Sequence, residues 1–162
     1  NLYCKKRFFS LIFKLVYFFL ILGLNASNCI LNSKNQIKSY SNYKKIYTLI
    51  VKPNLGCSTK KIYSKIKNFD KPKFNKFSKK MFNFEYLKKM TNTLEPIAFL
   101  MHAELKKIKF FLENLSQVEF VRMTGSGSAL IAYFHSKERC DNAQKQFNKK
   151  YKNYWCISSK TI

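Results

Sequence analysis

The sequence predicts a mixed α+β domain, and three observations lead to that prediction. Short segments rich in β-branched and aromatic residues alternate with turns, which is typical of strands. A long central stretch has apolar residues at helical spacing. The 162 residues, 46% of them hydrophobic and 17% aromatic, suffice for one domain with a core and argue against disorder or two complete domains.

The first part of the chain alternates strands and turns. Three segments have the composition of strands: residues 27–33, 36–39 and 45–51. The last of them, KIYTLIV, is the clearest, and Pro53 ends it. A turn over residues 54–59 then leads into a helix over residues 60–66, which Ser58 or Thr59 can cap.

The central part predicts helices. Residues 68–78 are rich in lysine and are expected to form a surface loop, whereas residues 81–90 suggest a short helix. The strongest helical segment covers residues 93–115, and Pro96 fits its first turn because no N–H is needed there. Its apolar residues follow a 3-4-3 rhythm: Leu94, Ile97, Ala98, Met101, Leu105, Ile108, Phe111, Leu112 and Leu115.

The C-terminal part predicts two strands over residues 119–124 and 129–134, a helix over 137–149 and a last strand over 153–158. This order, after a helical region, indicates a split β-α-β arrangement like the ferredoxin-like fold.

The charge of the chain is extreme, with 31 Lys and Arg residues against 8 Asp and Glu and a net charge of +23. Only Arg7, Arg122 and Arg139 are arginines, and the lysines are scattered along the whole chain. Residues with A/T-rich codons are abundant, so a nucleotide bias explains the charge without a specific nucleic-acid partner. A basic nucleic-acid-binding domain, with salt-sensitive affinity, stays an alternative.

The cysteines predict free thiols in a reducing cytoplasm rather than a metal site, because they form no C-x-x-C pair and their number is odd. With only two histidines in the chain, no zinc pattern can be assembled. The residues concerned are Cys4, Cys29, Cys57, Cys140, Cys156, His102 and His135.

The N-terminal segment is apolar over residues 8–24 and follows the basic run Lys5-Lys6-Arg7. This pattern resembles a signal sequence or a membrane anchor. Lys14 lies near its middle, where a charge is costly in hydrocarbon, so a buried segment of a cytoplasmic domain is favoured. A membrane-anchored basic protein stays the second alternative.

A loop of alternating glycine and serine carries the clearest functional signal. Its candidate residues are Thr124, Gly125, Ser126, Gly127 and Ser128. Such a loop lets a backbone approach an anion such as phosphate, while hydroxyl groups add donors. A tight hairpin between two strands explains the glycines equally well. The loop lacks the Gly-Lys-Ser/Thr ending of a Walker loop.

With Arg122 and Met123 before it, this loop resembles the third conserved motif of the GHMP small-molecule kinases. Residues 47–59 are similar to the strand, Pro-x-x-x-V-S-T turn and helix start of one branch of that family, with Cys57 in place of Val. Residues 92–96, NTLEP, are similar to its N-D-L-E-P helix start, with Thr93 in place of Asp. Three motifs in this order, over roughly residues 22–162, make the resemblance specific.

The resemblance implies transfer of the ATP γ-phosphate, with Mg²⁺, to the 2-hydroxyl of a CDP-linked methylerythritol in non-mevalonate isoprenoid biosynthesis. It places the loop near the phosphates, and Ser58, Thr59 and Tyr63 toward the nucleotide-bearing substrate. Glu95 is expected to hold structure rather than to catalyse.

The chain departs from the family at its N-terminal end. The family's catalytic Lys and ATP-binding glycine loop are absent, and the position of its catalytic Asp falls at Phe19, so no catalytic or metal-binding residue is assigned. Residues 1–21 are expected to be an apolar, frame-shifted or membrane-like stretch, residues 22–56 a remnant of the N-terminal kinase domain, and residues 57–162 the C-terminal domain. Without the missing N-terminal half, this fragment is expected to bind ATP poorly and to be inactive.

Overall fold

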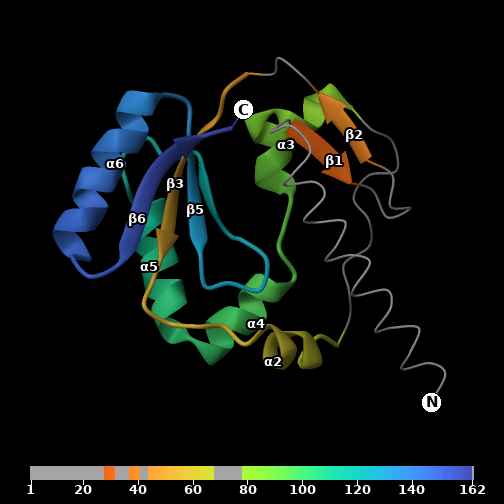
Figure 1. The fold of residues 1–162 in the computed structure, drawn as a ribbon, viewed down its shortest axis with the longest axis vertical. Helices are drawn as coiled ribbons and strands as arrows, with labels where there is room; N and C mark the ends of the chain where they lie inside the picture. Colours follow the sequence, from red (N-terminus) through yellow and green to blue (C-terminus); the bar gives the residue numbers. More distant parts are fainter. Residues whose placement is uncertain (1–27, 32–36, 41–43, 68–77, 162) are drawn as a thin grey trace.

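A computed structural model describes residues 28–31, 37–40, 44–67 and 78–161 (Figure 1). Its first element is a two-stranded antiparallel sheet, in which β1 (Asn28–Leu31) pairs with β2 (Ile37–Tyr40). The two short strands predicted at the start of the chain are therefore confirmed, with bounds that differ by one to two residues.

The second sheet has four strands in the order β4-β5-β3-β6, and every neighbouring pair is antiparallel. The strands are β3 (Tyr47–Lys52), β4 (Phe120–Met123), β5 (Leu130–Phe134) and β6 (Trp155–Lys160). The first strand in this sheet, β3, lies in the interior, and the last strand, β6, lies beside it at an edge. This is the strand order of the split β-α-β arrangement. The predicted ferredoxin-like arrangement is confirmed. The last strand starts two residues later than predicted, because residues 152–154 form a turn.

In the described part of the chain, six helical segments accompany this sheet (Figure 1). They are α2 (Thr59–Ser64), the 3-10 helix η1 (Lys79–Phe82), α3 (Phe84–Lys89), α4 (Leu94–Met101), α5 (Ala103–Glu113) and α6 (Lys137–Lys150). Helices α5 and α6 bury their apolar sides against one face of the sheet. The fully buried residues of this core include Leu49, Val51, Leu105, Ile108, Leu112, Leu130, Ala132, Phe134 and Phe147.

The sheet has a helix-covered face and a second, more open face. Successive residues of a strand point to opposite faces, so Leu49, which is fully buried in the core, and its neighbour Ile50 face opposite ways. The strand register sets Ile50 beside Ile131, and Ile131 beside Arg122. A row of side chains therefore crosses the open face, and Arg122 stands at its β4 end.

The long helix predicted over residues 93–115 is wrong in one respect, because the structure has two helices that meet at His102. The backbone of His102 has φ −139° and ψ 82°, which is not helical. The apolar rhythm continues across this break since Ala98 and Leu105 face the same core. The spacing of the apolar residues shows only which side of the helices is buried, and neither Gly nor Pro marks the break at His102. Likewise, the short helix predicted over residues 81–90 is split at Asn83 into η1 and α3.

Some predictions fall outside the described residues. These are the apolar segment over residues 8–24 with Phe19, and nearly all of the lysine-rich loop over residues 68–78. Within the ranges that the structure describes, no helix has the length and apolar character needed to cross a membrane.

Candidate functional site

The two hydroxyl residues at the start of α2 have different partners. Ser58 is the N-cap, as predicted, and its side chain accepts a hydrogen bond from the Lys61 N–H at 3.4 Å. Thr59 is the first helical residue, and its Oγ1 lies 2.8 Å from Oγ of Ser126. This hydrogen bond joins α2 to the glycine-serine loop across 67 residues of sequence.

The glycine-serine loop, residues 124–128, connects β4 to β5 as a tight hairpin. The N–H of Thr124 donates to the Ala129 carbonyl, and that of Gly127 donates to the Thr124 carbonyl, both at 2.9 Å. Gly125 and Gly127 have φ of +52° and +87°, in the left-handed region that favours glycine. The hairpin interpretation is therefore confirmed.

The two glycines serve different purposes. A Cβ on Gly127 would lie 2.8 Å from Sδ of Met123 and 3.2 Å from Sγ of Cys57, whereas a Cβ on Gly125 would meet nothing within 4 Å. Gly127 thus permits close packing against the protein's own sulfur atoms. Of these two glycines, Gly125 is the one with open space beside its Cα, and it lines the cavity described below.

The NTLEP segment, residues 92–96, holds the glycine-serine loop in place through side-chain hydrogen bonds. The amide of Asn92 donates to the carbonyls of Met123 and Gly125, both at 2.8 Å, while its oxygen accepts from the Leu94 N–H at 3.0 Å. One carboxylate oxygen of Glu95 accepts from the Met123 N–H at 2.7 Å, and the other is paired with Lys109. These contacts fit the structural role expected of Glu95. Asn92 belongs to the motif identified from the sequence, but its contacts with the loop carbonyls were not predicted.

Ser128 is tied into the protein rather than directed at a ligand. Its side chain is 2% exposed, and its hydroxyl donates to the Leu55 carbonyl at 2.5 Å. The same carbonyl accepts from the ammonium of Lys52 at 2.9 Å. Ser128 therefore fixes the loop to the turn before α2, and its hydroxyl is not available as the extra donor that the sequence suggested.

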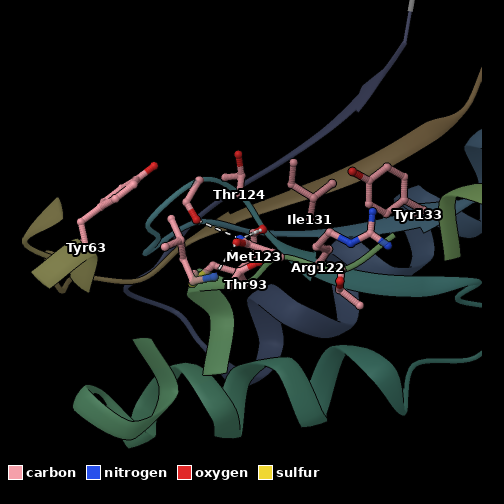
Figure 2. Close-up of a pocket in the computed structure, with 11 residues that line it drawn as sticks. Tyr63, Thr93, Arg122, Met123, Thr124, Ile131 and Tyr133 are labelled. Carbon is pink, nitrogen blue, oxygen red and sulfur yellow. Dashed lines mark hydrogen bonds between the residues drawn. The ribbon is translucent and has the colours of Figure 1, made fainter. Parts of the chain in front are cut away.

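A cavity of about 470 Å³ lies between α2, the start of α4 and the open face of the sheet (Figure 2). Its lining residues are Tyr63, Thr91, Asn92, Thr93, Leu94, Arg122, Met123, Thr124, Gly125, Ile131 and Tyr133. Figure 2 shows Tyr63 at one end and Arg122 with Tyr133 at the other. Of the predicted site residues, Tyr63, Thr124 and Gly125 line this cavity. The remaining five do not line it: Ser58, Thr59, Ser126, Gly127 and Ser128.

Two residues at the sheet end of the cavity, Arg122 and Tyr133, were not predicted from the sequence as site residues. Burial lowers the pKa of the Arg122 guanidinium below its ordinary value, while nearby Tyr133 and Glu95 act in the opposite direction. Burial also raises the pKa of the Tyr133 phenol above 10.0. At neutral pH the cavity therefore presents a cationic guanidinium and a neutral phenol. The alternation of β4 and β5 could have placed both side chains on one face.

The described residues offer no metal site. Within them, no group of three or more His, Cys, Asp or Glu side chains could hold a metal ion. This part of the chain thus lacks the carboxylate cluster that a protein-held Mg²⁺ prefers.

The chain is similar to a known protein family and to curated proteins. The family model described as GHMP kinases C terminal matches residues 66–153. The 4-diphosphocytidyl-2-C-methyl-D-erythritol kinase of Pelagibacter ubique (strain HTCC1062) is 50% identical over 142 residues, which are 88% of this chain and 50% of that protein. The kinase of the same name from Clostridium tetani (strain Massachusetts / E88) is 31% identical over 136 residues, 78% of this chain and 46% of that protein. The chain thus spans about half the length of the curated relatives it matches.

Two solved structures share the fold. A crystal structure of 4-(cytidine 5'-diphospho)-2C-methyl-D-erythritol kinase matches with a TM-score of 0.61 and 20% identity, covering 86% of this chain and 51% of that one. A homoserine kinase from Cytophaga hutchinsonii matches with a TM-score of 0.56 and 12% identity, covering 85% and 49%.

Proposed function

The chain belongs to the GHMP kinase family through its C-terminal domain, and we propose that it forms the substrate-binding part of a kinase that phosphorylates the 2-hydroxyl of CDP-methylerythritol with ATP. The observation that carries this proposal is the hydrogen bond between Thr59 and Ser126. It holds α2 against the glycine-serine loop, so that Tyr63 and the loop border one cavity.

The nucleotide end of the substrate is assigned to Tyr63. Its side chain is 49% exposed although it lines a cavity, so a large part of the ring is free to stack on a planar base. The two curated relatives at 50% and 31% identity are both named as kinases of a cytidine-diphosphate alcohol. Thr124 and Gly125 line the cavity nearby and would contact the part of the substrate closer to the reacting hydroxyl.

ATP and Mg²⁺ are the cofactors that this reaction uses. Among the described residues, no group of His, Cys, Asp or Glu side chains could hold the metal ion. The resemblance also gives the family's catalytic Lys and Asp no counterpart in this sequence. We expect those groups to come from the N-terminal kinase half that the family possesses. The present chain would contribute the walls of the substrate cavity and the positioning of the loop.

The test is to fuse this chain to the half of the Pelagibacter ubique kinase that it does not match, and to measure phosphate transfer from ATP to CDP-methylerythritol. We expect turnover by the fusion and none by the chain alone. Gly127→Val should lower the turnover by at least tenfold because it displaces the loop, whereas Gly56→Ala should leave it unchanged, since a Cβ at Gly56 meets nothing within 4 Å. A folded fusion that binds ATP but does not phosphorylate the CDP-alcohol would contradict the proposed substrate.

A further inference from the structure

Arg122 is the charged side chain among the described residues that line the cavity. It lies on β4, opposite Ile131 in the register, and therefore on the open face of the sheet. Figure 2 shows its guanidinium beside the ring of Tyr133, at the end of the cavity away from Tyr63. A cation fixed in the wall of a cavity otherwise lined by neutral groups marks that end for an anionic ligand.

The guanidinium has hydrogen-bonding capacity to spare. It carries five N–H donors, and one of its nitrogens donates to the Leu87 carbonyl of α3. In the described ranges, the ion pairs leave Arg122 without an acidic partner. The carboxylate of Glu95 is near enough to influence the pKa of Arg122, but its oxygens are occupied by Lys109 and by the Met123 N–H. A half-buried cation is thus left with donors for a ligand.

The position of this cation is fixed by its neighbours. The guanidinium carbon lies 5.0 Å from the ring centroid of Phe120, a cation–π contact. Phe120 also stacks on Tyr133, with centroids 4.2 Å apart and 17° between the ring planes. On its other side Phe120 meets Phe84 of α3, at 6.2 Å. Arg122 and Tyr133 are therefore held by one buried ring, so binding an anion requires little further ordering.

We propose that Arg122 is the anion anchor of this cavity and that it binds the diphosphate group of the nucleotide-linked substrate through paired N–H···O hydrogen bonds. The planar fork of an arginine matches two phosphate oxygens, which a lysine cannot do. The identity of the ligand rests on the proposed function, whereas the anion anchor rests on the cavity alone. Tyr63 and Arg122 lie at opposite ends of this cavity (Figure 2), as a ligand with a ring at one end and a diphosphate at the other requires.

The proposal is tested by calorimetric titration of the chain with inorganic pyrophosphate, CDP and cytidine. The variants are Arg122→Met, Arg122→Lys and, as a matched control for the loss of one positive charge, Arg139→Met on α6. We expect Arg122→Met to weaken pyrophosphate and CDP binding about 10- to 100-fold, the range for a hydrogen bond to a charged group. Cytidine binding should change less than about twofold. Arg122→Lys should bind pyrophosphate and CDP with an affinity between those of Arg122→Met and the unmodified chain. Arg139→Met should bind them like the unmodified chain.

The ratio of CDP to cytidine affinity separates anion binding from a structural role. If Arg122 only holds α3 through Leu87, thermal unfolding will shift but this ratio will not, and the proposal is overturned. Equal losses in Arg122→Met and Arg139→Met would overturn it as well, as would a failure of the unmodified chain to bind pyrophosphate or CDP. If pyrophosphate binds through Arg122 while CDP does not compete for it, the anchor stands and the proposed substrate is wrong.

Discussion

At the scale of single residues, the glycine-serine loop shows that one motif can combine two requirements. The sequence suggests that both glycines admit a ligand. The structure separates them, because Gly127 packs against Met123 and Cys57 while Gly125 borders the cavity. Sequence alone could not make this distinction, since the two sulfur atoms reach Gly127 from β4 and from the turn before α2.

The glycines give a first prediction. Gly127→Ala should destabilise the protein by about 2–4 kcal/mol, because it adds overpacking against the buried Met123 to the strain of a positive φ. Gly125→Ala should cost about 1 kcal/mol, from the backbone strain alone. Gly56→Ala, which has open space and no positive φ, should have little effect. Urea unfolding of the three variants checks this order, and a Gly125→Ala variant as unstable as Gly127→Ala would contradict it.

Asn92 gives a second prediction, because its amide holds two loop carbonyls. Asn92→Ala should lower the free energy of unfolding by about 1–3 kcal/mol. Asn92→Asp should lower it further, since a carboxylate oxygen would face the carbonyls of Met123 and Gly125. The control is Asn114→Ala at the exposed end of α5, which loses one hydrogen bond to Phe110 and should cost under about 1 kcal/mol. Denaturant titration at neutral pH measures all three, and equal stability of the Asn92 and Asn114 variants would disprove the bracing role.

At the scale of elements, alternation along β3 separates the packed face of the sheet from the face that carries the site. Leu49 is fully buried under the helices, while Ile50 is partly exposed on the open face. Leu49→Ala should therefore destabilise by about 2–5 kcal/mol, as for other buried leucines. Ile50→Ala should cost about 1 kcal/mol because less apolar area is lost. Chemical denaturation distinguishes them, and similar losses would mean that the two faces are wrongly assigned.

The strands and α6 could be predicted from the sequence because their signals are local. The β-branched and aromatic composition of residues 45–51 and the amphipathic pattern of residues 137–149 each lie within one segment. The break at His102 could not be predicted, since the buried face continues across it. The bracing of the loop was equally hidden, because Asn92 contacts carbonyls 31 and 33 residues away.

At the scale of the whole molecule, the buried thiol of Cys140 and the partly buried thiol of Cys156 link stability to pH. Burial raises the pKa of Cys140 from 9.0 to about 11 and that of Cys156 to about 12. The folded state then keeps these protons where the unfolded chain loses them, so their contribution to stability is complete below pH 9 and declines as pH rises through 11. The loss approaches about 1.4 kcal/mol per pH unit for one thiol.

Cys140→Ala isolates the contribution of the Cys140 thiol to this pH dependence. Between pH 9 and 10.5, the free energy of unfolding should fall less steeply in Cys140→Ala than in the unmodified chain. Denaturant unfolding at several pH values measures both slopes. Parallel slopes would show that the Cys140 thiol does not retain its proton in the folded state.

The assembly of the candidate site was partly foreseen at this scale. The resemblance implied that the glycine-serine loop lies near the phosphates and that Ser58, Thr59 and Tyr63 lie toward the substrate. In the structure, hydrogen bonds through Thr59 and Asn92 join α2 and the NTLEP segment to the loop. The contribution of the sheet was not foreseen. In the sequence, Arg122 and Tyr133 have the pattern of ordinary strand residues. The strand order is what places them on the open face, where they line one cavity with Tyr63 and the loop.

The central claim is that this cavity receives the CDP-alcohol, and backbone NMR of the ¹⁵N-labelled chain during titration with CDP-methylerythritol tests it most directly. The account predicts saturable shifts of the amide signals of Tyr63, Arg122, Thr124 and Gly125, with α6 unaffected. Cytidine alone should shift Tyr63 but leave Arg122 nearly unchanged. No saturable shift, or shifts centred on α5 and α6, would contradict the assignment of this cavity to the substrate.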